Sequence, residues 1–439
     1  MIQRSNRMWS LRSFQWAPLA TILVVATVVR VAWILYAAKS PQSLGDPFSY
    51  LSHASDIADG KGYRIPFSDT PTAYYPVGYP AILGAGYWFS RGISSSSTTL
   101  GTAVWLNVAA GVATVALVYV LGSRLTGRRA GLFAAGLVAV WPNLIFYTAT
   151  AYLESVFTFL VAAALTVILG RPLTRTGVPT PRLVAFALLV AAATMVRPIA
   201  LVLVPVMFVG WLWAEIGWRR AATQGALVLA VVVVVVLPWS IRSTATMNGL
   251  VLISTNNGDN LCIGHQPEST GRYHDLFEFC WPPYENEPVD EREVRRDRGN
   301  AGRALRYAVN NPDREARLLV SKTRHLLRHD HEGLLAVEEY GAQTFIPKGT
   351  QRLLRLVADV FWVALGALVL AALPAAIREG DVRRRILIAS GIGLLAVPLV
   401  FFGGVRFHVP VAPVLAMMAG LSMASLVSRV LPEGRDRRS

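Results

Sequence analysis

Charged residues are scarce in this 439-residue chain, and that shortage narrows its class. Asp, Glu, Lys and Arg make up 16% of the residues while 53% are hydrophobic, and the mean hydropathy is +0.43. A soluble globular domain carries roughly 25% charged residues. The shortage excludes an ordinary soluble protein and predicts an all-α chain that crosses a membrane several times.

Acidic residues are the scarcer of the two charged classes. The chain has 27 Asp and Glu against 42 Lys and Arg, which gives a formal net charge of +15. A basic protein of this kind can bind nucleic acid. Here, however, the arginines lie largely in short loops between apolar runs, which is how Lys and Arg orient a multi-pass membrane protein. We therefore expect membrane lipids as partners and no nucleic acid.

Two further motifs are missing. No glycine-rich phosphate loop follows a strand, which argues against a nucleotide-driven enzyme. No metal-binding motif is present, although His325 and His329 are spaced four apart as metal ligands on a helix can be. Such a lone pair is usually plain surface. We assign no metal ligands from the sequence, and we leave a divalent metal open as a candidate cofactor.

Cysteine is nearly absent from this chain. Cys262 and Cys280 are the only two, and both fall in the long hydrophilic segment 240–351. In an exported segment a disulfide between them is expected to persist, whereas in a reducing compartment they would be two free thiols. Both readings stay open at this point.

Long apolar runs are abundant. Several reach the roughly 20 residues that a bilayer-spanning helix needs. We predict about ten spans, and the short run Ala81–Phe89 is read as interfacial on the outer side. The predicted spans are Ala17–Ala38, Thr102–Leu121, Ala130–Phe146, Ala151–Leu169, two within Leu183–Trp213 separated by a turn at Met195–Pro198, Gly225–Trp239, Leu353–Ala376, Ile386–Phe402 and Val409–Val430.

The basic loops between these runs predict the topology. Placing them in the cytoplasm puts both chain termini there, including the basic tail Arg435–Arg438. Three parts follow: an N-terminal membrane module, 1–239, with a first outer loop at 39–101; an outer segment, 240–351, folded as a small helical cap broken at Asn311-Pro312; and C-terminal helices, 352–439. The expected location is a bacterial cytoplasmic (inner) membrane, with the site facing outward.

Five ionisable residues gather near the outer surface under this topology. They are Asp46, Glu154, Arg197, Arg242 and Arg406. Charges at that depth are costly in free energy and mark candidate functional sites. A carboxylate can act as a general base on a hydroxyl, and arginines can hold a phosphate. Each also has a plainer reading: Asp46 as N-cap of a short helix over Phe48–Ala58, the others as interfacial charges.

An ordered set of short motifs resembles the GT-C type of membrane glycosyltransferase, in its bacterial family 39-like branch related to protein O-mannosyltransferases and lipid A aminoarabinose transferases. The motifs are Gly45-Asp46, the turn Asp59–Tyr63, the segment Tyr74–Pro80, Leu125–Ala130, Trp141-Pro142, Tyr152–Ser155, Val196–Pro198, Pro238–Arg242, Ser254–Gly258, Asn310–Pro312 and Arg406–Pro410.

The resemblance implies a GT-C fold and a polyprenyl-phosphate-linked sugar donor, with a lipid, glycan or protein hydroxyl as acceptor. It implies that Asp46 is the general base and Glu154 the second acidic residue. Relatives often have an acid directly after the first Asp, where this chain has Pro47. The remaining site residues expected from it are Arg197, Arg242 and Arg406 for the donor phosphate and Tyr50, Tyr74, Tyr75, Tyr79 and His408 for sugar or acceptor.

Two other functions are consistent with a chain that has this many apolar runs. A transporter or flippase of lipid-linked sugars would show internal pseudo-symmetry and charges near helix centres. A non-catalytic assembly factor would use the outer cap for docking and would tolerate loss of Asp46. The charges cluster at one membrane surface, which favours an enzyme. For the sugar transfer that the resemblance implies, a single displacement would invert the anomeric carbon.

Overall fold

The computed structural model describes residues 3–41, 45–274, 279–280, 289–339, 345–378 and 381–430. The side chains of residues 3–16, 289, 290, 339 and 378 and the tail Arg435–Arg438 lie outside this description. Within the described residues the chain is all-α, with isolated bridges in place of strands.

The N-terminal module holds the first helices in chain order. They are α1 (Gln3–Ala37), α2 (Asp46–Ala58), α3 (Gly78–Ile93), α4 (Thr99–Thr126), α5 (Arg128–Val140), α6 (Pro142–Phe146), the 3-10 helix η1 (Tyr147–Ala149), α7 (Glu154–Leu169), α8 (Thr180–Val196), η2 (Pro198–Val202), α9 (Leu203–Trp213) and α10 (Trp218–Thr246).

The cap and the C-terminal helices follow. They are α11 (Asn257–Gly264), α12 (Val289–Asn310), α13 (Pro312–Leu327), α14 (Glu332–Glu339), α15 (Lys348–Arg378), α16 (Val382–Leu399), the 3-10 helix η3 (Val405–Val411) and α17 (Ala412–Val430).

Prolines and glycines set many of these boundaries. Gly127, at φ 93°, separates α4 from α5 in a backbone conformation that favours glycine. Pro142 and Pro198 each stand at the first position of a helix, where the missing N–H costs nothing. The breaks predicted at Met195–Pro198 and at Asn311-Pro312 are confirmed, since α8 ends at Val196 and α13 begins at Pro312.

Membrane-spanning helices form the bulk of the molecule. Five described helices are long and apolar enough to cross a bilayer, or six when the bent pair Arg128–Val140 and Pro142–Ala149 is one span. Three shorter apolar helices, Glu154–Leu169, Thr180–Val196 and Pro198–Trp213, accompany them. Every apolar run predicted to cross is therefore largely helical, while the total of about ten spans stays a prediction.

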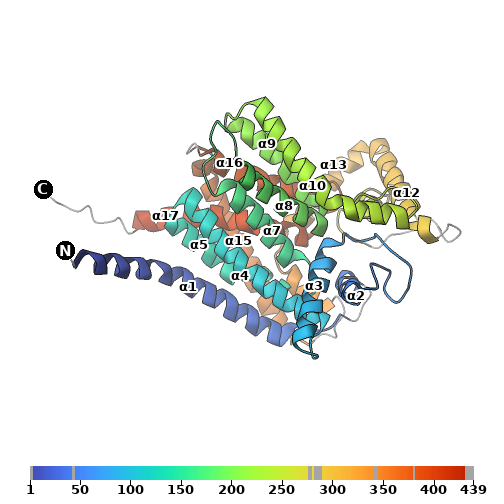
Figure 1. Cartoon of the computed structure of the whole chain (residues 1–439), viewed down its shortest axis with the longest axis horizontal. Helices are drawn as coiled ribbons and strands as arrows, with labels where there is room; N and C mark the ends of the chain where they lie inside the picture. Colours follow the sequence, from blue (N-terminus) through green and yellow to red (C-terminus); the bar gives the residue numbers. More distant parts are fainter. Residues whose placement is uncertain are drawn as a thin grey trace.

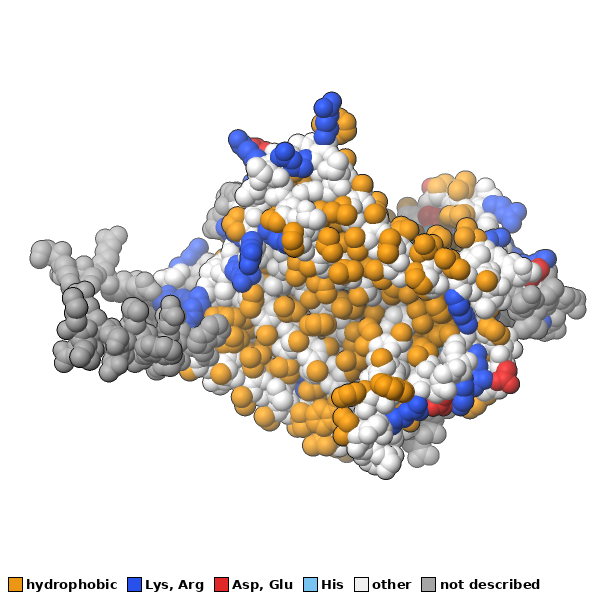
Figure 2. All heavy atoms as spheres, viewed as in Figure 1, with side chains coloured by type: hydrophobic (Ala, Val, Ile, Leu, Met, Phe, Trp, Pro, Cys, Tyr) orange, Lys and Arg blue, Asp and Glu red, His pale blue; other side chains and the backbone are white. Residues whose placement is uncertain are grey.

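A broad apolar surface covers the middle of the face shown in Figure 2, and Lys and Arg lie toward its margins. Helix α10 contributes Val233, Val234 and Leu237 to the exposed apolar residues. Exposed apolar area on this scale requires lipid rather than water around it. The chain is thus a multi-pass membrane protein.

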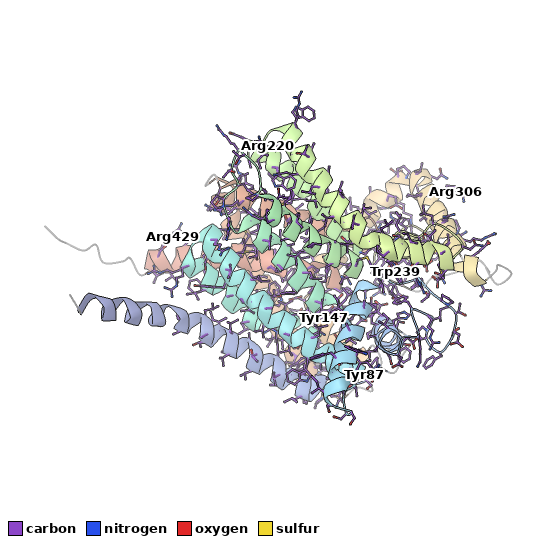
Figure 3. All side chains as sticks on the ribbon, viewed as in Figure 1. Tyr87, Tyr147, Arg220, Trp239, Arg306 and Arg429 are labelled. Carbon is purple, nitrogen blue, oxygen red and sulfur yellow. A yellow bond between two sulfur atoms is a disulfide. The ribbon has the colours of Figure 1, made fainter. Side chains whose placement is uncertain are left out.

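The two ends of the molecule differ in what they carry. In Figure 1, α1 begins and α17 ends on the left, while α2, α3, α12 and α13 lie on the right. Figure 3 places Arg220 near the top and Arg429 at the left, away from Tyr87 at the lower right and Arg306 at the right. This arrangement agrees with basic inner loops at one membrane surface and with the first loop and the cap at the other.

Arg30 shows how a charge is accommodated within the first span. Its side chain is fully buried, which keeps the charge away from lipid. Its guanidinium donates to the carbonyls of Val138 and Ala139 at 3.0 and 2.9 Å. Those carbonyls lack helical partners because α5 breaks just before Pro142, so Arg30 supplies the missing donors and joins α1 to α5.

The outer segment folds as a helical cap. Its helix α11 packs against α12, and a disulfide joins Cys262 of α11 to Cys280. Glu293 fastens the cap to the first outer loop by accepting from the Thr72 hydroxyl at 2.6 Å and the Ala73 N–H at 3.0 Å. The segment that leads to Tyr74 and Tyr75 is thereby held in place.

Candidate active site

Asp46 is the first residue of α2, and its side chain turns away from helix capping. Gly45 is the N-cap and no side-chain capping bond is made there, so the N-cap reading of Asp46 is wrong. The Tyr75 hydroxyl donates to Oδ1 of Asp46 at 2.9 Å, and Nη1 of Arg406 donates to Oδ2 at 2.7 Å. The carboxylate is 23% exposed, so it is largely enclosed yet reachable.

The surroundings of Asp46 favour its ionised form. Burial raises the pKa of the Asp46 carboxyl, but the charge and hydrogen bond of Arg406 and the hydroxyl of Tyr75 outweigh burial and leave it below its ordinary 3.8. Burial and the neighbouring Asp46 raise the pKa of Tyr75. Near neutral pH Tyr75 is therefore a donor and Asp46 an acceptor, and each carboxylate oxygen retains a further lone pair for an incoming hydroxyl.

A second carboxylate–arginine pair lies close by. Nη2 of Arg197 donates to Oε1 of Glu154 at 2.8 Å. The Glu154 side chain is fully buried at the start of α7, and its other oxygen has no hydrogen-bond partner. Because Arg197 follows α8 and precedes Pro198, its side chain leaves the helix at the break. The pair thus holds a guanidinium at a fixed point between two helix ends.

Phe407 links the two arginines. The guanidinium carbons of Arg197 and Arg406 each lie 5.3 Å from the centre of its ring. A guanidinium over an aromatic face is attracted by the ring quadrupole. This attraction and the carboxylates of Glu154 and Asp46 offset the repulsion between the two like charges, so both cations lie beside the same ring.

These groups border one cavity of about 310 Å³. Its polar lining includes Asp46, Arg197, Arg406 and asparagines of the cap, and much of its apolar lining comes from the end of α8, the start of η2 and the end of α16. The lining residues include Tyr50, Tyr74, Tyr75, Val196, Pro198, Ile199, Asn256, Asn257, Asn260, Tyr273, Val397, Phe401, Phe402 and Phe407.

The predicted tyrosines divide into two groups. Tyr50, Tyr74 and Tyr75 line the cavity. Tyr79 is fully buried behind them, with its ring packed edge-on against Tyr50 at 5.4 Å. Tyr74 donates to Asp259 of α11 at 3.0 Å, so its hydroxyl is directed to the cap. Three of the four are thus brought together with Asp46, while Tyr79 supports them.

Arg242 and His408 lie away from the cavity lining. Arg242 donates to the carbonyls of Thr72 and Tyr63 at 2.8 and 2.7 Å, which ties α10 to the first loop. His408 is buried, with its ring nitrogens 2.8 Å from the carbonyl oxygen of Leu326 and from Asp330. The structure therefore does not bring these two residues to Asp46, and the phosphate and sugar roles expected for them gain no support.

Sequence reasoning missed two features of this region. The cap asparagines Asn256, Asn257 and Asn260 line the cavity, although from the sequence only the motif Ser254–Gly258, which contains the first two, was named, with no role in the site. Asp259 accepts from Tyr74 and from Nε of Arg296 at 3.1 Å, which makes it the centre of the contact between cap and first loop. The one sequence signal that could have identified these asparagines and Asp259 is that they lie close together at positions 256–260, directly before the apolar residue Leu261.

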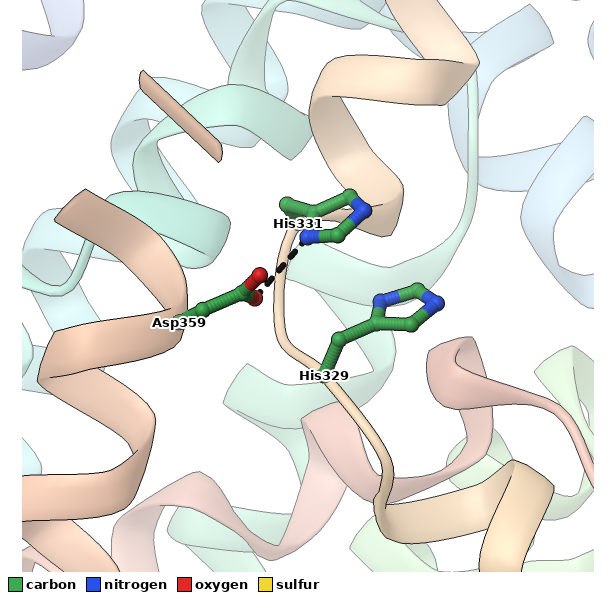
Figure 4. A group of neighbouring side chains, drawn as sticks. All are labelled: His329, His331 and Asp359. Atoms are coloured by element: carbon green, nitrogen blue, oxygen red, sulfur yellow. Dashed lines mark hydrogen bonds and ion pairs between the residues drawn. The ribbon is translucent and has the colours of Figure 1, made fainter. Parts of the chain in front are cut away.

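A metal ion has one candidate place among the described residues. His329, His331 and Asp359 offer ligand atoms within 4.8 Å of one another (Figure 4). Neither Asp46 nor Glu154 belongs to a comparable group within those ranges. His325, noted in the sequence for its spacing from His329, is not part of this group, because α13 ends at Leu327 and the helical spacing stops there.

Comparison with known proteins identifies the fold of this chain through solved structures but finds no match at the level of sequence. No protein-family model matches the chain, and no curated protein matches its sequence. Among solved structures, archaeal oligosaccharyltransferase AglB from Archaeoglobus fulgidus, in complex with an inhibitory peptide and a dolichol-phosphate, matches with a TM-score of 0.55 at 13% identity over 95% of this chain. The chain has the GT-C fold.

Two further structures agree in coverage. AglB in complex with Zn and sulfate matches with a TM-score of 0.52 at 14% identity over 93% of this chain. This chain spans 51% and 49% of the two AglB chains, about half their length. ArnT from Cupriavidus metallidurans, bound to undecaprenyl phosphate, aligns over 96% of this chain and 80% of its own at 14% identity, with a TM-score of only 0.42. The likeness to the two oligosaccharyltransferase structures shows the fold alone, because their sequence identity to this chain is so low.

Proposed function

We propose that this chain is a membrane glycosyltransferase. It moves a sugar from a polyprenyl-phosphate-linked donor to an acceptor hydroxyl on the outer side of a bacterial cytoplasmic membrane, with both chain termini inside. The observation that carries the proposal is the meeting of Asp46, Arg197 and Arg406 at one enclosed cavity, from three distant parts of the chain. A base beside two fixed cations suits attack by a hydroxyl with loss of a phosphate.

The polar and apolar residues that line the cavity suit a lipid phosphate. Arginine forks bind phosphate oxygens in pairs, and Arg197 and Arg406 supply two such groups. The apolar lining from Ile199, Val397 and Phe401 suits the first units of a prenyl chain. The similar AglB structure contains a dolichol-phosphate, which is a lipid of this class. The acceptor is a lipid, glycan or protein hydroxyl.

In this mechanism Arg406 interacts with two anions, the Asp46 carboxylate and the donor phosphate. Without donor it pairs with Asp46. When the phosphate enters, Arg406 is shared with it, which weakens its hold on the carboxylate. The pKa of Asp46 then rises toward its ordinary value, and the carboxylate becomes a better base when the sugar is in place. Donor binding and base strength are coupled in this way.

The chemical step is a single displacement. The acceptor oxygen forms a bond to the anomeric carbon while its proton passes to Asp46. The bond from that carbon to the phosphate oxygen breaks, and the electron pair leaves with the polyprenyl phosphate beside Arg197 and Arg406. One displacement at the anomeric carbon inverts its configuration. General base catalysis of this type contributes about 10²–10⁴-fold in rate.

Glu154 and Arg242 hold other groups of the site in position. Glu154 fixes the guanidinium of Arg197 and so aims it at the phosphate, rather than meeting the sugar itself. Arg242 holds the two carbonyls of the first loop that precede Tyr74. Tyr50, Tyr74 and Tyr75 offer faces and hydroxyls for the sugar ring or acceptor.

The test is a donor panel. Purified protein is incubated with polyprenyl-phosphate-linked sugars and with lipid, glycan or peptide acceptors, and free polyprenyl phosphate is measured. We expect acceptor-dependent release with at least one donor, and an inverted linkage in the product. Movement of intact donor across vesicles without cleavage would instead support a flippase and overturn the proposal.

A further inference from the structure

A cluster of metal-binding side chains lies where the cap returns to the membrane. His329 and His331 stand in the short connection between α13 and α14, and Asp359 comes from the outer half of α15. Figure 4 shows the two rings on one side of a small gap and the carboxylate on the other. The rings are stacked, with their centres 4.0 Å apart.

One ring nitrogen of this cluster lacks a partner. Nδ1 of His329 is buried and has no hydrogen-bond partner. Nδ1 of His331 lies 2.8 Å from Oδ1 of Asp359. A buried ring nitrogen without a partner costs free energy, and native structures rarely tolerate one without a reason. Two imidazoles and one carboxylate are the ligand set of many three-ligand zinc sites.

The distances suit a bound ion after small shifts. The three ligand atoms lie within 4.8 Å of one another. Four ligands placed tetrahedrally about 2.0–2.1 Å from zinc are about 3.3 Å apart. The His331–Asp359 contact needs to open by roughly half an ångström for this geometry, and the His329 nitrogen needs to move inward by rotation of its ring.

We propose that His329, His331 and Asp359 bind one divalent transition-metal ion of the zinc type, with water as the fourth ligand. Imidazole and carboxylate together favour zinc over magnesium or calcium, which prefer oxygen ligands alone. The Asp359 side chain is 37% exposed and the His331 side chain 14% exposed, so an ion and its water can reach the site from outside.

The site ties the cap to the active site. Asp330, between the two histidines, is fully buried, and it accepts from Asn143 and lies 2.8 Å from Nε2 of His408. His408 is two residues beyond Arg406. A metal that fixes residues 329–331 against α15 therefore fixes the segment η3, which presents Arg406 to the cavity. The metal acts on position and takes no part in sugar transfer.

The experiment measures zinc directly. Full-length protein in detergent is stripped with EDTA, dialysed and titrated with zinc chloride, with calorimetry and metal analysis as readouts. Wild type is expected to bind about one equivalent, and His329→Ala and His331→Ala to bind more than about 100-fold more weakly, since even outer partners of a metal site are worth 10–100-fold. His325→Ala is the matched control, one turn before the site on α13, and it is expected to bind like wild type.

A second readout separates binding from folding. Zinc is expected to raise the Tm of wild type and of His325→Ala, and to leave the Tm of His331→Ala unchanged. Should His331→Ala fail to fold, His329→Ala and Asp359→Asn carry the same test. Failure of stripped wild type to take up zinc overturns the proposal, and so does binding that is equal in wild type, His331→Ala and Asp359→Asn.

Discussion

Arg406 is the residue on which most of the site depends. It bonds to Asp46, lies over Phe407 and borders the cavity beside Arg197. Asp46 and Arg406 are 360 positions apart in the chain. Both were predicted as site residues, but no local pattern relates them, so their pairing could come only from the fold.

Arg406→Gln is expected to weaken binding of polyprenyl phosphate by about 10–100-fold, because a charge-assisted hydrogen bond is worth about 1.5–3 kcal/mol. Arg197→Gln should act in the same direction. Equilibrium binding of the lipid to purified protein measures the effect. Arg306→Gln, an exposed change of equal charge in the cap, is the control. Wild-type affinity in both cavity variants would refute the phosphate assignment.

The cap and the membrane helices pack tightly against each other where they meet. A Cβ on Gly264, the last residue of α11, would lie 1.7 Å from the carbonyl oxygen of Phe401, which borders the cavity. Such contacts carry no signal in hydrophobic periodicity. The helices themselves were predictable because proline, glycine and apolar runs act locally, whereas the way that cap and body touch depends on pairs far apart in sequence.

Gly264→Ala is therefore expected to destabilise the cap by about 1–3 kcal/mol, the usual cost of overpacking. Gly302→Ala is the matched control, since Gly302 lies within α12 and nothing stands within 4 Å of its Cβ position. It should stabilise by about 0.5–1 kcal/mol because alanine favours helix. Thermal unfolding in detergent compares the two, and a Tm for Gly264→Ala at or above that of Gly302→Ala would contradict the packing argument.

The cap also contains a lysine whose charge opposes folding. Burial lowers the pKa of Lys322 from 10.5 to about 8, although Glu315 partly counters this. Between these values the unfolded chain binds the proton and the folded chain does not, so stability rises with pH from about 8 to 10.5. Lys322→Met should remove that rise, while Lys61→Met, at an exposed lysine, should retain it. Parallel Tm–pH curves for wild type and Lys322→Met would contradict this assignment.

The whole molecule is polarised, with arginine-rich loops at one end and the first loop and cap at the other (Figure 3). Composition and loop charge predict which of these ends faces the cytoplasm because they act through the membrane as a whole, and that orientation stays a prediction. The cluster of His329, His331 and Asp359 was not predicted by contrast, because helical spacing relates His325 to His329 only as far as Leu327, where α13 ends. Helical spacing in a sequence predicts neighbouring side chains only as far as the helix itself extends.

Orientation can be measured with single cysteines. The two native cysteines are bridged, so an added one is the sole free thiol of the chain. Ser96→Cys, in the loop between α3 and α4, should react with a membrane-impermeant maleimide in intact cells. Thr176→Cys, between α7 and α8, should react only after the cells are permeabilised. The reverse pattern would invert the topology.

The central claim is that Asp46 is the base of a sugar transfer, and the turnover of Asp46→Asn measured beside its lipid affinity tests it most directly. The variant should lose at least about 100-fold in turnover. It should bind polyprenyl phosphate as well as wild type or better, because Arg406 no longer shares its charge with a carboxylate. Asp69→Asn, whose side chain is 96% exposed in the same loop, should remain active. Turnover of Asp46→Asn within a few-fold of wild type would contradict the account.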